Sequence, residues 1–172
     1  MPLIGIIAKK RDIQAIKKEL QESNIKVIEI TKKAIENVKN VSFEEIIILE
    51  DINLKLEEYK YMKEIITKSK YLILNGDVKI KILDEIKVQK PIKVITFGFN
   101  SKATITISSI KEEKIIVCLQ RDIEKVDGNI IETQEKEIKI GKENCKKIYN
   151  KLAVFIIEQL HNLWTTNKTT RI

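Results

Sequence analysis

The first part of the chain repeats one pattern, in which an apolar run of strand length precedes apolar residues at helical spacing. Leu3–Ala8 is such a run, and Ile13, Ile16 and Leu20 follow it at the spacing of one helix face. The β-branched stretch Lys26–Ile30 comes next. These segments predict a βαβ unit, which is the building block of a parallel sheet.

The same alternation continues as far as Gly98. It predicts helices over Thr31–Val38, Leu54–Ser69 and Val78–Ile86, and strands over Glu45–Leu49, Tyr71–Leu74 and Lys93–Phe99. Strands with continuous apolar runs suit a parallel sheet that helices cover on both faces. We therefore expect an α/β fold of three layers, with a mostly parallel, Rossmann-like sheet in the middle.

After Gly98 the period of the pattern changes from helical spacing to alternation. Ala103–Ile107 alternates with period two, as a half-exposed strand does. Asp127-Gly128 lies between Lys114–Val126 and Asn129–Ile140, and this dipeptide predicts a hairpin with a type I′ turn. The sheet is thus expected to end in an antiparallel C-terminal hairpin.

A final C-terminal helix is predicted from Glu143 to about Trp164, and Gly141 precedes it. No repeat or linker interrupts the chain, so we expect residues 1–164 to form a single domain. The polar segment 165–172 is expected to be a flexible tail.

Length and composition agree with one globular core. The chain has 172 residues, of which 43% are hydrophobic, and a chain of this size buries roughly 70% of its unfolded surface. No apolar run reaches the about 18 residues of a membrane span, and no basic-then-apolar leader is recognised, so we expect a cytoplasmic protein with no membrane partner. Cys118 and Cys145 form no metal-ligand spacing and are expected to be reduced, although a bridge between them stays open.

The net charge of +7 raises the question of nucleic acid, because clustered Lys and Arg side chains displace counterions from phosphates. Here the lysines alternate with glutamates along the chain, and aromatic residues make up only 5%. No aromatic-rich strand or recognition helix is visible. The sequence therefore disfavours nucleic acid as a partner.

The order of the segments resembles the central domain of the Mur ligases and the related folyl-polyglutamate synthetases. Leu3–Ile7 is similar to the strand before the P-loop of that family, Tyr59–Lys63 to its Tyr-x-x-x-Lys segment, and Leu74–Asp77 to its Asn-x-Asp-Asp turn. "VITFGFNSKATITISSI" resembles its glycine-containing turn between strands, and "GKENCKKIYNKLAVFIIEQL" resembles the opening of its last helix. The resemblance implies a P-loop-NTPase-like sheet.

The chain departs from the family where the family binds ATP and metal. A phosphate-binding loop needs glycines, a lysine and a hydroxyl, but here no glycine follows Gly5 in the loop, and no Ser or Thr lies in the loop or in the helical segment that directly follows it. Glu50–Asn53 takes the place of the family's Asp-His segment without a histidine, and Val78 replaces the second Asp of the turn. We expect no cofactor and no metal ion.

Five residues remain candidates for an anion or nucleotide site. Lys9, Lys10 and Arg11 lie at the expected start of the first helix, where side chains and N–H groups can hold an anion. Asn75 and Asp77 follow a parallel strand, at the edge where open α/β sheets bind ligands. The alternatives are a solvated basic turn for the first group and a turn that bonds its own backbone for the second.

Other polar residues receive no catalytic role. The resemblance implies that Lys63 matches a carbamylated, metal-binding lysine, whereas without the rest of that site it is a solvated helix residue. His161 and Trp164 are expected to pack against or cap the last helix. The hairpin also carries carboxylates to which no acid or base role is assigned: Asp122, Glu124, Glu132 and Glu135.

Three functions are compatible with these observations. The preferred one is a non-catalytic, Mur-ligase-like binding or interaction module that has lost ATP-dependent ligase chemistry, with an unknown small-molecule or protein partner. The second is an enzyme with a remodelled phosphate or nucleotide site at the carboxyl edge of the sheet. The third is a basic nucleic-acid-binding protein. Because other domains cover this domain in the Mur ligases, a homodimer is also expected.

Overall fold

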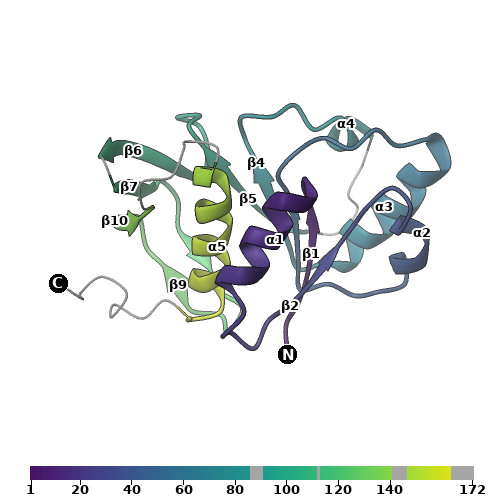
Figure 1. Cartoon of the computed structure of the whole chain (residues 1–172), viewed down its shortest axis with the longest axis horizontal. Coiled ribbons are helices and arrows are strands. Elements are labelled where there is room, and N and C mark those ends of the chain that lie inside the picture. Colours follow the sequence, from purple (N-terminus) through teal and green to yellow (C-terminus); the bar gives the residue numbers. More distant parts are fainter. Residues whose placement is uncertain (86–90, 112, 141–146, 164–172) are drawn as a thin grey trace.

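The computed structural model describes residues 1–85, 91–111, 113–140 and 147–163. Helices lie on both faces of an eight-stranded sheet (Figure 1). The strands of this sheet are β1 (Leu3–Ile7), β2 (Lys26–Glu29), β3 (Glu45–Ile48), β4 (Tyr71–Asn75), β5 (Lys93–Gly98), β6 (Ile105–Lys111), β7 (Lys114–Leu119) and β10 (Gln134–Lys139). A separate ladder contains β8 (Ile123–Glu124) and β9 (Ile130–Ile131). The helices are α1 (Lys10–Glu19), α2 (Ile35–Val38), α3 (Leu56–Lys68), α4 (Ile82–Glu85) and α5 (Ile148–Leu160).

The predicted fold class is confirmed: the protein is α/β with a mostly parallel central sheet. The strand order is β10-β7-β6-β5-β4-β3-β1-β2. Neighbouring strands from β2 to β6 are parallel, whereas β7 is antiparallel to both β6 and β10. The order reverses between β1 and β3, and the carboxyl ends of the strands at such a switch point form the usual ligand crevice of doubly wound sheets.

Two apolar layers cover the two faces of the sheet. On one face α1 and α5 lie side by side, and Ile13, Ile16 and Leu152 join the same cluster as Ile6 and Ile47 (Figure 1). On the other face α2 and α3 bring Ile35, Met62 and Ile66 against a second cluster. The continuous apolar strands β1, β3 and β4 are therefore buried on both sides, as their sequence predicts.

The C-terminal hairpin differs from its prediction in two ways. Instead of one long ladder, β7 pairs with β10 in the main sheet and β8 pairs with β9 outside it. The predicted type I′ turn is wrong, because Gly128 has a φ of +86° while Asp127 does not have a positive φ. Gly128 N donates to Lys125 O, and Lys125 N donates to Asn129 O. This is a type I turn followed by a glycine bulge, which uses the Asp-Gly pair with only one positive φ.

Other boundaries also move. The predicted helix Thr31–Val38 begins later, as α2, because the Thr31 hydroxyl instead accepts a hydrogen bond from the Ala34 amide. The predicted helix Val78–Ile86 begins only at Ile82 of α4, and its last predicted residue lies outside the described residues. The first residues predicted for the last helix, together with Cys145, Trp164 and the tail, lie outside the described residues. Cys118 is a free, half-buried thiol on β7. No helix in the described part of the chain is long and apolar enough to cross a membrane.

The end of α5 is fastened to the β8–β9 turn. Leu163 N donates to Glu158 O, and Asn162 adopts a φ of 57°, the left-handed conformation of a Schellman cap. The Asn162 side chain then bonds the turn, donating to Asp127 Oδ2 at 2.7 Å and accepting from Lys125 Nζ at 2.7 Å. This cap fixes the small ladder beside the amino ends of the central strands.

Candidate functional site

The connection from β1 to α1 contains only Ala8 and Lys9. The Lys9 carbonyl accepts hydrogen bonds from the amides of Asp12 and Ile13, which closes the first turn of α1. The Lys9 ammonium lies 3.7 Å from Glu50 Oε2, just beyond the end of β3. Lys9 thus spans the switch point between β1 and β3, but a carboxylate of the chain already faces it.

The two neighbouring cations do not converge with Lys9 on a common point. Lys10 and Arg11 are exposed, and Arg11 Nε lies 3.8 Å from Asp12 Oδ1. Asp12 Oδ1 also accepts a hydrogen bond from Asn150 Nδ2 of α5 at 3.1 Å. Two of the three cations, Lys9 and Arg11, therefore lie beside carboxylates of the chain, and the carboxylate of Asp12 also links the two helices of this face.

Asn75 and Asp77 form a turn that bonds its own backbone. The Asn75 Oδ1 atom accepts from the Asp77 amide at 3.0 Å, while Asn75 Nδ2 donates to Leu49 O at 3.1 Å. Asn75 is buried, and its amide joins the end of β4 to the end of β3. This is the local arrangement that Asn and Asp favour in turns.

The Asp77 carboxylate lies in the turn that follows β5. The amides of Phe99 and Asn100 donate to its two oxygens at 2.6 and 2.9 Å, and the Tyr149 hydroxyl donates to Oδ2 at 3.0 Å. Gly98 permits this approach, because a Cβ there would lie 2.3 Å from Asp77 Oδ2 and the residue has a φ of +148°. Burial, together with the Asp77 carboxylate, raises the pKa of Tyr149 to about 12. The N–H groups of this turn therefore hold an anion that belongs to the chain itself.

Lys63 lies within α3, and no hydrogen bond or ion pair joins its side chain to another described residue. In the described part of the chain, no group of three His, Cys, Asp or Glu side chains is arranged to hold a metal ion. Of the five predicted residues, the structure brings Asn75 and Asp77 together, and it places Lys9 at the neighbouring strand end.

The opposite, amino edge of the sheet contains a buried acid–base pair. Glu45 begins β3, its side chain is 0% exposed, and its Oε1 lies 2.6 Å from Nε2 of His161, the C-cap residue of α5. Glu45 Oε2 has no hydrogen-bond partner among the residues that the structure describes. Burial raises the pKa of Glu45, and the hydrogen bond and charge of His161 offset this only in part. The pair fastens the end of α5 to the central strand.

The next two strands extend this polar edge. Tyr71 of β4 is the register partner of Glu45, and its hydroxyl donates to Glu124 O at 2.9 Å. Lys93 of β5 pairs with the Glu124 carboxylate at 2.8 Å and lies 5.4 Å from the centre of the Tyr71 ring. The hydrogen bond to Glu124 raises the pKa of Lys93, and burial raises that of Tyr71. These contacts hold β8 over the start of β5.

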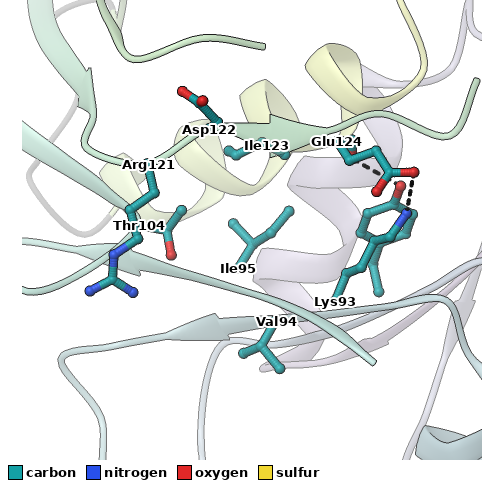
Figure 2. A pocket seen from close by; sticks show the side chains of 9 residues that line it. Lys93, Val94, Ile95, Thr104, Arg121, Asp122, Ile123 and Glu124 are labelled. Carbon is teal, nitrogen blue, oxygen red and sulfur yellow. Dashed lines mark hydrogen bonds and ion pairs between the residues drawn. The ribbon is translucent and has the colours of Figure 1, made fainter. Parts of the chain in front are cut away.

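A cavity of about 260 Å³ lies between β5 and the segment 121–124. Figure 2 shows Ile95 and Ile123 facing each other across it, with Lys93 and Glu124 at one end and Arg121 and Thr104 at the other. The Asp122 side chain points away and accepts a hydrogen bond from the Thr133 amide. The cavity combines apolar walls with a cation at one end and an ion pair at the other.

Sequence reasoning missed this amino edge. Glu45 and His161 are separated by 116 positions, and nothing local connects them. The available signals were weak: a glutamate at the head of an apolar strand, and the single histidine of the chain. The sequence identifies Glu124 as a hairpin carboxylate but does not indicate its partner Lys93.

Comparison of the chain with protein-family models gives no match, and comparison with curated proteins gives none either.

Proposed function

We propose that this chain is a non-catalytic binding or interaction module, built on a scaffold similar to the central domain of the Mur ligases, that has lost ATP-dependent chemistry. The proposal rests on how the polar groups at the carboxyl edge of the sheet are arranged. Only Ala8 and Lys9 connect β1 to α1, and the Asp77 carboxylate takes up the N–H groups of the turn after β5. A bound phosphate would need those donors or a glycine-rich loop.

The resemblance to the Mur ligases is supported by where its segments end. The strand Leu3–Ile7, the turn Leu74–Asp77 and the turn after β5 all reach the carboxyl edge of the sheet. Tyr149, from the segment that opens α5, contacts Asp77 there. Such convergence is what a degenerate nucleotide domain of this family would retain.

An enzyme with a remodelled phosphate site is the second candidate. The basic trio Lys9, Lys10 and Arg11 favours it, because Lys9 lies at the switch point of the sheet and Lys10 and Arg11 follow it in the first turn of α1. The two candidates differ in what they predict for phosphate ligands.

A thermal-shift series separates them. We expect no stabilisation by ATP, ADP, GTP, UDP-sugars or phosphate, with or without Mg²⁺. A ligand at about 100 times its Kd adds about 2.7 kcal/mol, so specific binding would be seen as a higher Tm. A magnesium-dependent shift that disappears in the triple variant Lys9→Glu, Lys10→Glu, Arg11→Glu would reject the module and support the enzyme. A variant with Lys26→Glu, on the far edge strand β2, serves as the charge control.

A further inference from the structure

β5 is paired with β4 along one side, but on its other side it pairs with β6 only near its carboxyl end. β4 pairs with it from Lys93 to Phe97, but β6 reaches only Phe97 and Gly98. The first residues of β5 are therefore an open strand edge inside the sheet, facing the cavity (Figure 2). An open edge presents unpaired N–H and C=O groups to any chain that can pair with them.

The hydrogen bonds to β4 show which groups face the cavity. Lys93 N donates to Lys70 O, and Phe97 O accepts from Gly76 N, so the odd-numbered residues of β5 turn their backbone toward β4. Val94 and Thr96 consequently turn theirs away from it. The Thr96 amide is covered by Thr104 Oγ1 at 3.3 Å, whereas no described residue pairs with the backbone of Val94.

The charges around this edge leave one cation free. Lys93 is paired with Glu124, and Asp122 is bonded to the Thr133 amide. Arg121 is exposed at the other end of the cavity, and its guanidinium forms no ion pair within the described part of the chain. A ligand that carries one negative group would complement the cavity.

We propose that this cavity binds a short, extended peptide segment of another protein. One residue of the segment exchanges both backbone hydrogen bonds with Val94, as a residue of an antiparallel strand does. An apolar side chain of the adjacent residue of the segment, which lies on the face of Ile95 because successive side chains alternate, packs against Ile95 and Ile123, and a carboxylate at one end of the segment meets Arg121. This deepens the proposed function, on which it rests, by naming the class of partner.

The size and rigidity of the cavity support a short segment. Its volume of about 260 Å³ is below the roughly 300–1,000 Å³ of pockets that take drug-sized ligands. The contacts of Glu124 with Lys93 and Tyr71 fasten one wall, and the Asn162 cap fastens the turn behind it. A wall that is already ordered lowers the entropic cost of binding.

The test uses random short peptides displayed in both free-carboxylate and amidated forms, selected on the whole protein. The Kd of each enriched peptide is then measured by fluorescence polarisation on the wild type, Arg121→Glu, Val94→Pro and Lys26→Glu. We expect enriched peptides to carry a carboxylate, and to bind Arg121→Glu and Val94→Pro at least about tenfold more weakly, because each change removes one recognition contact. Lys26→Glu, which changes the charge equally on the far edge strand, should bind as the wild type does. The amidated arm shows whether that carboxylate is a side chain or the chain end.

Proline is tolerated at an unpaired strand edge, so Val94→Pro should fold, and circular dichroism checks this. Hydrogen exchange gives an independent reading on the wild type, since bound peptide should slow exchange of the Val94 amide. The proposal would be overturned if no peptide were enriched on the wild type relative to Arg121→Glu, or if the enriched peptides bound all variants equally. Light scattering that shows Val94-dependent self-association would also overturn it, because the occupant would then be a second copy. A nucleotide shift that depends on Lys9, in contrast, would reject the proposed function without changing exchange at Val94.

Discussion

The two edges of the parallel sheet differ in whether their polar groups are paired within the chain. At the carboxyl edge, where doubly wound folds bind ligands, the chain satisfies its own groups: Lys9 faces Glu50, and Asp77 fills the turn after β5. At the amino edge, Glu45 Oε2 lacks a partner, Val94 has an unpaired backbone, and Arg121 has no ion pair within the described residues. Glu45 is fully buried, so only the Val94 backbone and Arg121 can meet a ligand, and both lie at the edge opposite to the usual site of this fold.

The largest expected effect lies at the amino edge, where the buried pair is removed. His161→Ala leaves the Glu45 carboxyl buried without its partner and should cost about 3 kcal/mol in the free energy of unfolding, measured by urea denaturation. Replacing both residues by leucine removes the buried charge altogether and should cost less than the sum of the single changes. If the costs of the two single changes instead add up to that of the double change, the two side chains are not energetically coupled. The amino edge would then not differ from the carboxyl edge in this respect.

The pH dependence of stability should report the same burial. Because burial raises the native pKa of Glu45 above the ordinary 4.5, the native state holds a proton that the unfolded chain has already lost. Stability should then fall as the pH rises from about 4.5 through the raised native pKa. Glu45→Gln removes this titration while Glu44, Tyr71 and His161 remain, so its stability curve should be flatter there. Parallel curves for the two proteins would contradict the burial argument.

At the carboxyl edge, the strongest test concerns the hydrogen bonds that the Asp77 carboxylate accepts from the turn after β5. Asp77→Ala removes the acceptor for Phe99 and Asn100 and should cost about 1–2 kcal/mol, since water replaces part of these exposed bonds. Gly98→Ala should destabilise by about 1–3 kcal/mol, because it combines an unfavourable φ with a clash against the same carboxylate. In the Asp77→Ala background the clash is absent, so Gly98→Ala should cost less. An equal cost in both backgrounds would assign its whole effect to the backbone.

The Tyr149 phenol, which donates a hydrogen bond to Asp77, allows the same carboxylate to be followed by absorbance. Its pKa of about 12 lies above the ordinary 10.0, so the native state holds its proton while the unfolded chain loses it, and stability falls as the pH rises from 10 toward 12. Phenolate absorbance should show a late-titrating tyrosine that is absent in Tyr149→Phe and shifted to lower pH in Asp77→Asn. An unchanged titration in Asp77→Asn would mean that the carboxylate does not contribute.

The smallest effect is expected at the switch point. Lys9→Ala breaks an ion pair whose side chains are 61% and 36% exposed, and such pairs contribute less than about 1 kcal/mol. Urea denaturation at low and high salt measures this. A larger, salt-sensitive loss would mean that the carboxyl edge holds a coupled charge network, and the two edges would then be more alike than the structure indicates.

The strands and helices of the first part of the chain were predictable, because their apolar positions follow the burial of each segment. Glu45–Ile48 and Tyr71–Asn75 are examples, since strands buried on both faces read as apolar runs. The Asp127-Gly128 hairpin was located correctly, but its turn type was wrong, because the same dipeptide fits two loops of different length. Among the candidate residues, Asn75 and Asp77 could be placed at the end of a strand from the order of the segments. The partners of Asp77 could not be predicted in this way.

By itself, the sequence determined the α/β class and the absence of a glycine-rich phosphate loop, because both depend on residues that are neighbours along the chain. Only the tertiary structure decided that His161 meets Glu45, that Tyr149 meets Asp77, and that β6 covers just the end of β5. Periodicity reports how deeply a segment is buried. It contains no information on which distant segment lies opposite, since crossovers, strand order and the length of each pairing set that contact.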